Sequence, residues 1–220
     1  MSTDGLEDLT IERTSTAGKI AEVLRVRIMR GDIAPGTPLT EGSLASNIGV
    51  SRNTVREGIR RLVAEGLLQH EFQRGVTVTR TTSDDVREIF DIRRRLEVAA
   101  IRESGEELCR QLAKVVQELE EEVSSDNAVR LVDIDLVFHQ TIVDSLGNAR
   151  LSTFFANAMA VLRLALFKVD MLAQDTRVWI RQHSEIVGVL ESGDRRAAAK
   201  LMEKNLHATE KKLMGMMALE

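Results

Sequence analysis

Thiol groups are nearly absent from this chain, which has one cysteine, Cys109, among 220 residues. A single thiol can form no internal disulfide and cannot supply the several cysteine ligands of a Cys-based zinc site. A chain without disulfides suits a reducing compartment, and its first ten residues are polar and acidic, unlike a signal peptide. We therefore expect a cytoplasmic protein.

Aromatic residues, prolines and long apolar runs are also scarce. Tyrosine is absent, aromatic residues make up 3% of the chain, and both prolines, Pro35 and Pro38, lie in one short loop. We find no apolar run that approaches the ~20 residues of a membrane-spanning helix, so no membrane partner is expected. The prolines mark the end of a first predicted helix, from about Thr16 to Arg30.

Charge is distributed unevenly along the chain. The formal net charge is -4, which taken alone argues against a nucleic-acid partner. Residues 10–80, however, are net positive, whereas the residues before and after them are net negative. A basic block joined to an acidic remainder is typical of a DNA-reading domain attached to a domain that does not touch DNA.

The segment from Thr40 to Val78 has the pattern of a winged helix-turn-helix. Thr40 can cap a short helix that ends at Gly49, and Ser51 can cap a second helix from Arg52 to Glu65. Two short helices with glycine at the turn, the second opening on polar and basic residues, are typical of a recognition helix and its partner.

Residues 67–78 predict a two-stranded wing after the second helix. Two short runs of strand-forming residues flank a tip with the sequence Gln73-Arg74-Gly75. Gly75 would let the backbone approach DNA closely, and Arg74 would reach a phosphate or the minor groove. We therefore predict DNA contacts at both tip residues, Arg74 and Gly75.

The first turns of the second helix carry side chains that can read bases. Arg52 or Arg56 can make a bidentate contact with guanine, and Asn53 can pair with adenine. Ser51 and the helix N-terminus suit a phosphate group. Because one winged module covers too little DNA for specific recognition, we expect a homodimer on a palindromic, double-stranded operator.

The chain beyond a short hinge at residues 81–83, whose Ser83 can cap the next helix, predicts only helices. Turn residues separate six segments with helical periodicity, over residues 84–104, 106–123, 128–146, 149–169, 175–192 and 194–216. The predicted fold is an α+β winged helix-turn-helix followed by an all-α six-helix bundle. Its parts are a flexible segment 1–15, a DNA-binding domain 16–80, the hinge 81–83, and an effector-binding and dimerisation domain 84–220.

Charged and polar residues interrupt the apolar faces of three bundle helices. Arg93 and Glu97 lie in the apolar stripe of the first, Asp135 and His139 share a face of the third, and His183 lies among apolar residues of the fifth. A buried charge needs a partner, so three such helices suggest one shared polar cavity. An Asp and a His at i, i+4 can chelate a metal ion, although such a pair can equally be a buried ion pair or a core histidine.

Three motifs stand out in the N-terminal half: Gly-Val-Ser-Arg-Asn-Thr-Val-Arg-Glu (49–57), Arg-Gly-Asp-Ile-Ala-Pro-Gly (30–36) and Glu-Gly-Leu-Leu (65–68). They closely resemble the GntR family of bacterial transcription regulators. One departure is that Asn53-Thr54 stands where the family usually has Thr-Pro, which alters chemistry that faces the bases without threatening the fold.

The helical half carries Arg93 and Glu97, Asp-Leu-Val-Phe-His (135–139), Gly-Asn (147–148), Gln-His (182–183) and Ser-Gly-Asp (192–194). In this order these residues resemble the FCD effector domain of one GntR subgroup. The resemblance implies a divalent metal bound by one Asp and three His, beside an effector that bears a carboxylate.

Three of the four implied ligand positions match, at Asp135, His139 and His183. The fourth position carries Asn205, whose amide oxygen could complete the site or leave it weaker. Imidazole and carboxylate ligands suit zinc, manganese, nickel or iron. Arg93, with Glu97 one turn away, is the residue pair expected to meet the carboxylate of a small organic-acid effector.

The leading prediction is a ligand-responsive transcription regulator that is not an enzyme. One alternative is a metal-dependent hydrolase built on the bundle, which the missing H-E-x-x-H motif and the lack of an evident general base argue against. Another is a constitutive DNA-binding protein whose helical half only dimerises, which leaves the polar residues of the three bundle helices unexplained.

Overall fold

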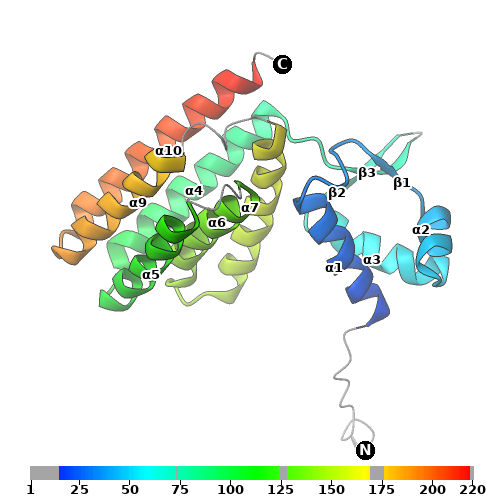
Figure 1. Cartoon of the computed structure of the whole chain (residues 1–220), viewed down its shortest axis with the longest axis horizontal. Helices are drawn as coiled ribbons and strands as arrows, with labels where there is room; N and C mark the ends of the chain where they lie inside the picture. The colour runs from blue at the N-terminus through cyan, green and yellow to red at the C-terminus, as the bar shows by residue number, and fades with distance from the viewer. Residues whose placement is uncertain (1–14, 73, 124–127, 169–175, 219–220) are drawn as a thin grey trace, which may run out of the picture.

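The structure, a computed structural model, describes residues 15–72, 74–123, 128–168 and 176–218. The predicted flexible segment 1–15 lies outside these residues except for Ser15. Figure 1 shows two bodies: a winged head, residues 15–81, and a helical bundle, residues 82–218. Each has its own hydrophobic core.

The winged head is a helix-turn-helix with a small sheet. Its elements are α1 (Thr16–Met29), β1 (Pro38–Leu39), α2 (Glu41–Ile48), α3 (Arg52–Ala64), β2 (Leu68–Glu71) and β3 (Gly75–Val78). The three strands are antiparallel in the order β1-β3-β2. The predicted helices and wing are confirmed, whereas β1 was read as loop because two residues are too few to show a strand alternation.

The ends of α2 and α3 follow the predicted capping chemistry. The Thr40 hydroxyl accepts from the backbone N–H of Ser43, and the Ser51 hydroxyl accepts from that of Thr54. Gly49 ends α2 in the left-handed region, at φ 74°, which glycine adopts without steric cost. These caps fix the sharp turn that sets the direction of α3.

The cap of α4 differs from the prediction by one residue. Ser83 was expected to begin the helix as its cap, but Thr82 does so. The Thr82 hydroxyl accepts from the backbone N–H of Asp85, and the Asp85 carboxylate accepts from the backbone N–H of Thr82 at 2.7 Å. This reciprocal box places two bonds at the helix start, more than a lone serine cap provides.

Close packing of α1 on α3 depends on Gly58. A β-carbon at this position would lie 3.1 Å from the backbone oxygen of Ala17 and 3.1 Å from Cγ2 of Ile20. Neither neighbour is the free end of a flexible side chain. The absent side chain therefore lets α3 approach α1 closely.

We predict that Gly58→Ala destabilises the winged head. Overpacking costs about 1–3 kcal/mol, and the gain in helix propensity recovers at most ~1 kcal/mol of it. Thermal unfolding followed by circular dichroism measures the loss. Gly188→Ala is the matched control, because a β-carbon added at that helical glycine would meet nothing within 4 Å; a Gly58→Ala protein as stable as Gly188→Ala would contradict the prediction.

Six helices occupy the described residues of the bundle. They are α4 (Ser83–Glu103), α5 (Glu106–Glu122), α6 (Ala128–Asp144), α7 (Ala149–Lys168), α9 (Thr176–Glu191) and α10 (Arg195–Met217). Each matches one predicted segment, with ends that coincide or differ by one or two residues; the predicted end points 169 and 175 lie outside the described residues. The all-α prediction is confirmed for the part of the bundle that the structure describes.

One bundle helix, α7, is unusually apolar. Among the described residues it holds a window, Ala149–Leu166, whose mean hydropathy of 1.2 would suffice for a membrane span. The sequence prediction overlooked this window because Arg150, Ser152 and Asn157 interrupt the apolar run. The window also contains Arg163, which is only 1% exposed and bonded within the fold, as expected for a core helix.

Candidate functional site

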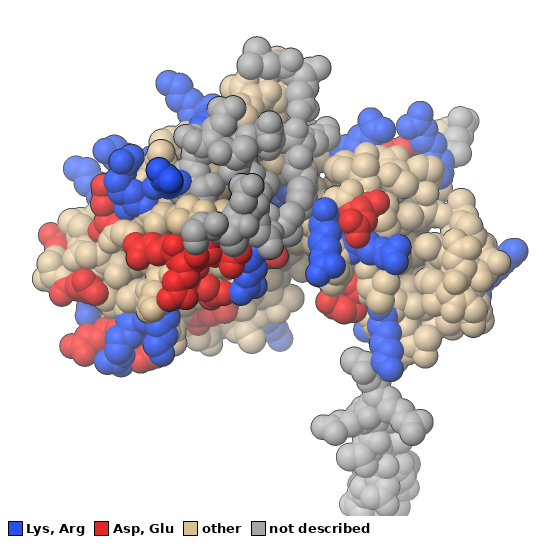
Figure 2. All heavy atoms as spheres, viewed as in Figure 1, with Lys and Arg blue, Asp and Glu red and all other residues tan. Residues whose placement is uncertain are grey.

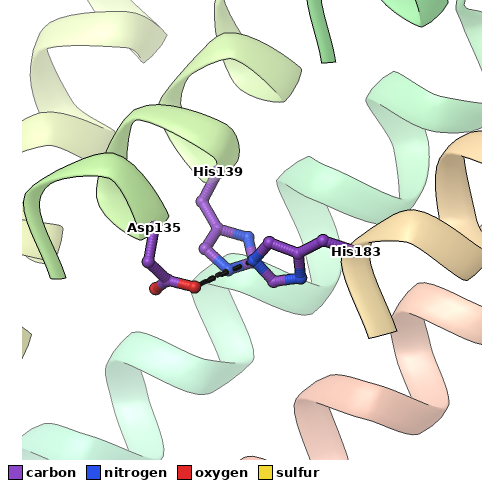
Figure 3. Close-up of side chains that lie close together, drawn as sticks. All are labelled: Asp135, His139 and His183. Carbon is purple, nitrogen blue, oxygen red and sulfur yellow. Dashed lines mark hydrogen bonds and ion pairs between the residues drawn. The ribbon is translucent and has the colours of Figure 1, made fainter. Parts of the chain in front are cut away.

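Two helices bring three predicted metal ligands together (Figure 3). Asp135 and His139 lie one turn apart on α6, and His183 points towards them from α9. Oδ1 of Asp135 lies 2.8 Å from Nε2 of His183 and 3.8 Å from Nε2 of His139. One potential ligand atom from each residue lies within 4.8 Å of the other two. The face-sharing predicted from the sequence thus produces a compact cluster.

Glu97 supports this cluster from behind. Its side chain is 0% exposed, and its Oε2 lies 2.6 Å from Nδ1 of His139. A carboxylate can only accept here, so Nδ1 of His139 donates the hydrogen bond and Nε2 is the ring nitrogen that faces Asp135. The second oxygen, Oε1, accepts from Nε of Arg93 at 2.7 Å. Glu97 therefore links Arg93 to the cluster and orients the His139 ring.

The buried carboxylates of the cluster remain ionised. Burial acts to raise the pKa of Asp135, but the charge of His139 and the hydrogen bond from His183 outweigh it and lower the pKa to about 2. Burial likewise opposes ionisation of Glu97, yet Arg93 and His139 hold the pKa of Glu97 below its ordinary value. Both groups are therefore acceptors at neutral pH.

His183 is held in place as a neutral ring. Burial lowers the pKa of His183, and Asp135 only partly opposes this effect. The ring stacks on Phe138 with centroids 4.0 Å apart, which restrains its orientation. Its Nδ1 is buried and has no hydrogen-bond partner among the described residues. Neutral imidazole is the form that binds metal ions.

The cluster opens on a cavity of about 40 Å³ inside the bundle. Most of the wall is apolar, from Phe90, Met159, Leu162, Leu166, Ile186, Met202 and Leu206. Arg93 also lies in the wall, with its guanidinium carbon 5.0 Å from the centre of the Phe90 ring, and within the described part of the chain its two terminal nitrogens make no hydrogen bond or ion pair. Glu97, which was predicted beside Arg93 at the effector, is not part of the wall, because its two oxygens are engaged by Arg93 and His139, the wall residues in front of it.

Asn205 lines the same cavity from α10, at the position where the resemblance implied a fourth ligand. Its Nδ2 is buried and has no hydrogen-bond partner among the described residues. Because the two ends of an amide are interchangeable by rotation, the side chain can offer either a donor or an oxygen to an occupant. His207 is exposed, with Nδ1 2.9 Å from the backbone oxygen of Glu203, and it is not part of the cavity wall.

Three further polar residues of the wall were not predicted. Trp179 and Gln182 precede His183 on α9, and Thr209 follows Asn205 by one turn on α10. Helical spacing from the predicted residues could have found Thr209 and Trp179, each four positions from a cavity residue. Gln182 adjoins His183 in the chain, a position that helical periodicity places on a different side.

The cluster fits a divalent metal ion. Two imidazole nitrogens and one carboxylate are the ligand types that zinc, manganese, nickel and iron accept. The carboxylate behind His139 is the second-sphere partner that metal-binding histidines commonly have. An ion bound through Nε2 of His183 would replace the hydrogen bond from that nitrogen to Asp135, and the ring proton would then lie on Nδ1, which has no partner among the described residues.

The predicted DNA-reading residues lie on the exposed start of α3. Arg52 and Asn53 are exposed, and Ser51 caps the helix. Arg56 is also exposed, but both ends of its guanidinium bond the carboxylate of Glu41 on α2, at 2.8 and 2.7 Å. The sequence did not predict this pair, which joins the two helices of the helix-turn-helix.

The wing tip, where DNA contacts are predicted, is exposed. Gly75 has φ 77°, a conformation that favours glycine, and nothing lies within 4 Å of a β-carbon built there. Arg74 is exposed and lies 3.6 Å from the carboxylate of Glu71; Gln73 lies outside the described residues. Figure 2 shows several basic and a few acidic side chains on the surface of the winged head, while the bundle carries acidic and basic side chains together.

Comparison with known families decides the identity of the chain. Residues 16–78 match the model of the bacterial regulatory proteins of the gntR family, and residues 88–208 match the FCD domain. The chain belongs to the GntR family. Its two matched regions coincide with the winged head and the helical bundle, so this GntR protein carries an FCD domain after its DNA-binding region.

Curated relatives of this GntR protein are transcription regulators. The gluconate operon transcriptional repressor of Bacillus licheniformis is 28% identical over 90% of this chain and 83% of its own length. The HTH-type transcriptional repressor RspR of Escherichia coli K12 is 28% identical over 86% and 84%. A regulator from an unstable DNA locus of Streptomyces ambofaciens is 32% identical over 84% and 79%.

Solved structures share the fold. A GntR transcriptional regulator from Rhodococcus sp. RHA1 superposes with a TM-score of 0.84 at 25% identity, covering 90% of this chain and 97% of the other. McbR/YncC of E. coli has a TM-score of 0.74 at 18% identity, covering 91% and 98%, and supports the fold alone. The chain is thus a DNA-binding transcription regulator, and its relatives are regulators and not enzymes.

Proposed function

We propose that this GntR protein is a ligand-responsive regulator that binds a palindromic operator as a homodimer. A small carboxylic acid, held in a metal-containing cavity of the bundle, would change its affinity for DNA. One observation carries this proposal: Asp135, His139 and His183 converge on a buried cavity that also contains the unpaired end of Arg93. Buried polar groups are unfavourable in a purely structural core, and a cluster of them around a cavity is typical of a binding site.

The metal would be held by Asp135, His139 and His183, with Asn205 or water completing its shell. Zinc, manganese, nickel and iron all suit this set. When bound, the ion supplies a fixed positive charge that attracts an anionic ligand. Glu97 keeps His139 in the tautomer that binds metal through Nε2.

The acid would place its carboxylate near the metal and Arg93. A guanidinium that faces a largely apolar cavity needs an anion, and Glu97 occupies only its Nε. The first relative is named for a gluconate operon, and gluconate is itself a carboxylate, which agrees with an acid as effector.

On the DNA side, Ser51, Arg52, Asn53 and Arg56 would contact the operator from α3, and Arg74 and Gly75 from the wing. The exposure of these residues supports the assignment. Glu41 would hold Arg56 at the protein surface and restrict it to one direction of approach. Such a protein would work in the cytoplasm, where the chromosome is.

The second candidate is a constitutive DNA-binding protein whose bundle serves only to dimerise. Asp135 and His183 already satisfy each other through a hydrogen bond and need no metal ion, which favours this alternative. Metal analysis of the purified protein, combined with a thermal-shift screen of small carboxylic acids, separates the two. We expect bound metal and stabilisation by at least one acid; a metal-free protein that no acid stabilises would leave only the constitutive reading.

We predict that Asn205→His raises metal occupancy and thermal stability. A fourth imidazole would replace an amide or water, and binding of the ion to the folded state stabilises it by mass action. Metal content by elemental analysis, before and after reconstitution, measures the change. His207→Ala, an exposed histidine on the same helix, is the control and should change neither quantity. Equal metal content in Asn205→His and the parent protein would count against a site at this position.

A further inference from the structure

The helix α7 contacts both the cavity and the winged head. Met159, Leu162 and Leu166 line the cavity, whereas Ala160 and Leu164 pack with the core of the head. At 100° per residue the centres of the two sets lie roughly 150° apart around the helix. One helix therefore presents nearly opposite faces to the ligand cavity and to the DNA-binding unit, an arrangement that Figure 1 places between the two bodies.

The contact with the head is part of its core and not a surface touch. Leu164 is 1% exposed and belongs to the same buried cluster as Leu24 of α1 and Leu62 of α3. In the chain, Leu164 follows Val78, the nearest other buried member of that cluster, by 86 residues (164 − 78). The hydrophobic core of the head is thus completed by a residue of the bundle.

Two polar contacts fix α7 to the head in one register. The hydroxyl of Thr81, which is 4% exposed, donates to the backbone oxygen of Val161 at 3.1 Å. Nε of Arg163 donates to the backbone oxygen of Met29, the last residue of α1, at 3.1 Å. Arg163 also pairs with Asp133 of α6, so one side chain joins α1, α6 and α7.

Burial of the Arg163 guanidinium is energetically unfavourable, so this residue does more than fill space in the core. It is 1% exposed, and burial lowers its pKa against the opposing effect of Asp133. A buried cation is retained where its partners hold it in one geometry, and apolar side chains of similar size often stabilise a fold equally well. The position therefore favours a residue that specifies how the head sits on the bundle.

The cavity is small, so a larger ligand must displace one of the helices that form its wall. About 40 Å³ accommodates roughly three water molecules. An organic acid of more than a few heavy atoms cannot enter without outward movement of a wall. Because protein interiors are densely packed, a displaced wall helix carries its other contacts with it.

We propose that α7 transmits occupancy of the cavity to the winged head, with Arg163 and Thr81 as the residues that couple the helix to the head. This inference rests on the proposed function, since it names how the same cavity would act on DNA binding. Pressure on Met159, Leu162 and Leu166 shifts α7, and the shift moves the head through Leu164 and Arg163. The operator affinity then changes because the two heads of a dimer must match two half-sites.

The experiment uses a side chain in place of an unknown effector. Ile186→Phe on α9 enlarges a residue of the cavity wall, and its effect on operator affinity is measured by fluorescence anisotropy with DNA selected by the parent protein. We expect the dissociation constant to change by about 5-fold or more, a typical coupling. Combined with Arg163→Met, the same substitution should change it by less than about 2-fold.

Arg150→Met is the matched control, an exposed arginine on the same helix, and it should leave the full effect of Ile186→Phe intact. Should Arg163→Met fail to fold, Thr81→Val removes only the other bond and should reduce the effect. Two results would overturn the inference. One is that Ile186→Phe changes the operator dissociation constant equally with and without Arg163→Met or Thr81→Val. The other is a folded Ile186→Phe protein whose operator affinity is unaltered.

The cavity itself is tested separately through Trp179, the single tryptophan of the chain, which lies in the cavity wall. Its fluorescence on titration with Zn²⁺ reports occupancy without reference to DNA. If Trp179 fluorescence responds to Zn²⁺ but Arg163→Met leaves the effect of Ile186→Phe unchanged, only the proposed role of α7 is refuted and the metal proposal stands. Coupling through Arg163 without any response to Zn²⁺ refutes the metal proposal and leaves the role of α7 standing.

Discussion

Arg52→Ala should abolish specific operator binding and leave the protein folded. Arg52 is exposed at the first position of α3, directly after the Ser51 cap, so no core contact is lost. One bidentate arginine–guanine contact contributes about 1–3 kcal/mol of discrimination, and a dimer has two such contacts. Gel-shift competition between operator and unrelated DNA measures the loss of preference.

Arg56→Ala should also abolish recognition, for two combined reasons. It removes a second basic group from the predicted interface, and it breaks the bidentate pair with Glu41 that joins α3 to α2. Arg60→Ala is the control, because Arg60 lies further along the helix and should weaken binding to all sequences slightly and equally. Unchanged preference for the operator in both Arg52→Ala and Arg56→Ala would refute the assignment of α3 as the reading helix.

His183→Ala should remove the metal ion from the purified protein. Two ligands on one helix then remain, and α9 no longer contributes to the site. Asp135 also loses its hydrogen-bond partner, so the apo protein should be less stable than the parent. Elemental analysis and zinc-dependent thermal shifts measure both effects.

The control for this substitution is His207→Ala, which removes an exposed histidine. Its metal content and its response to zinc should match those of the parent protein. Full metal content in His183→Ala would mean that the ion is bound elsewhere.

Local patterns predicted the parts of this fold that local physics determines. The caps at Thr40 and Ser51, the glycine turn at Gly49 and the apolar faces of the bundle helices were all visible in the sequence. The strand β1 was not, because its two residues take their conformation from pairing with β3 and not from their own pattern. The cap at Thr82 was missed because its neighbour Ser83 has the same chemistry.

The sequence predicted the members of the polar cluster but not the hydrogen bonds that join them. Helical projection placed Asp135 and His139 on one face, and the interruption of an apolar stripe marked His183. No local signal tells that Glu97 faces His139 and not the cavity, since this depends on how α4 packs against α6. The same holds for Arg163 and its bond to Met29, which joins residues 134 positions apart.

Control of DNA binding by a metal-held acid in the cavity underlies the proposed function. Its most direct test is an anisotropy titration of zinc-loaded protein on selected operator DNA, with a panel of small carboxylic acids and with His183→Ala alongside. We expect at least one acid to change the dissociation constant by about 5-fold or more and His183→Ala not to respond. An operator affinity that no acid alters, or an equal response from His183→Ala, would contradict it.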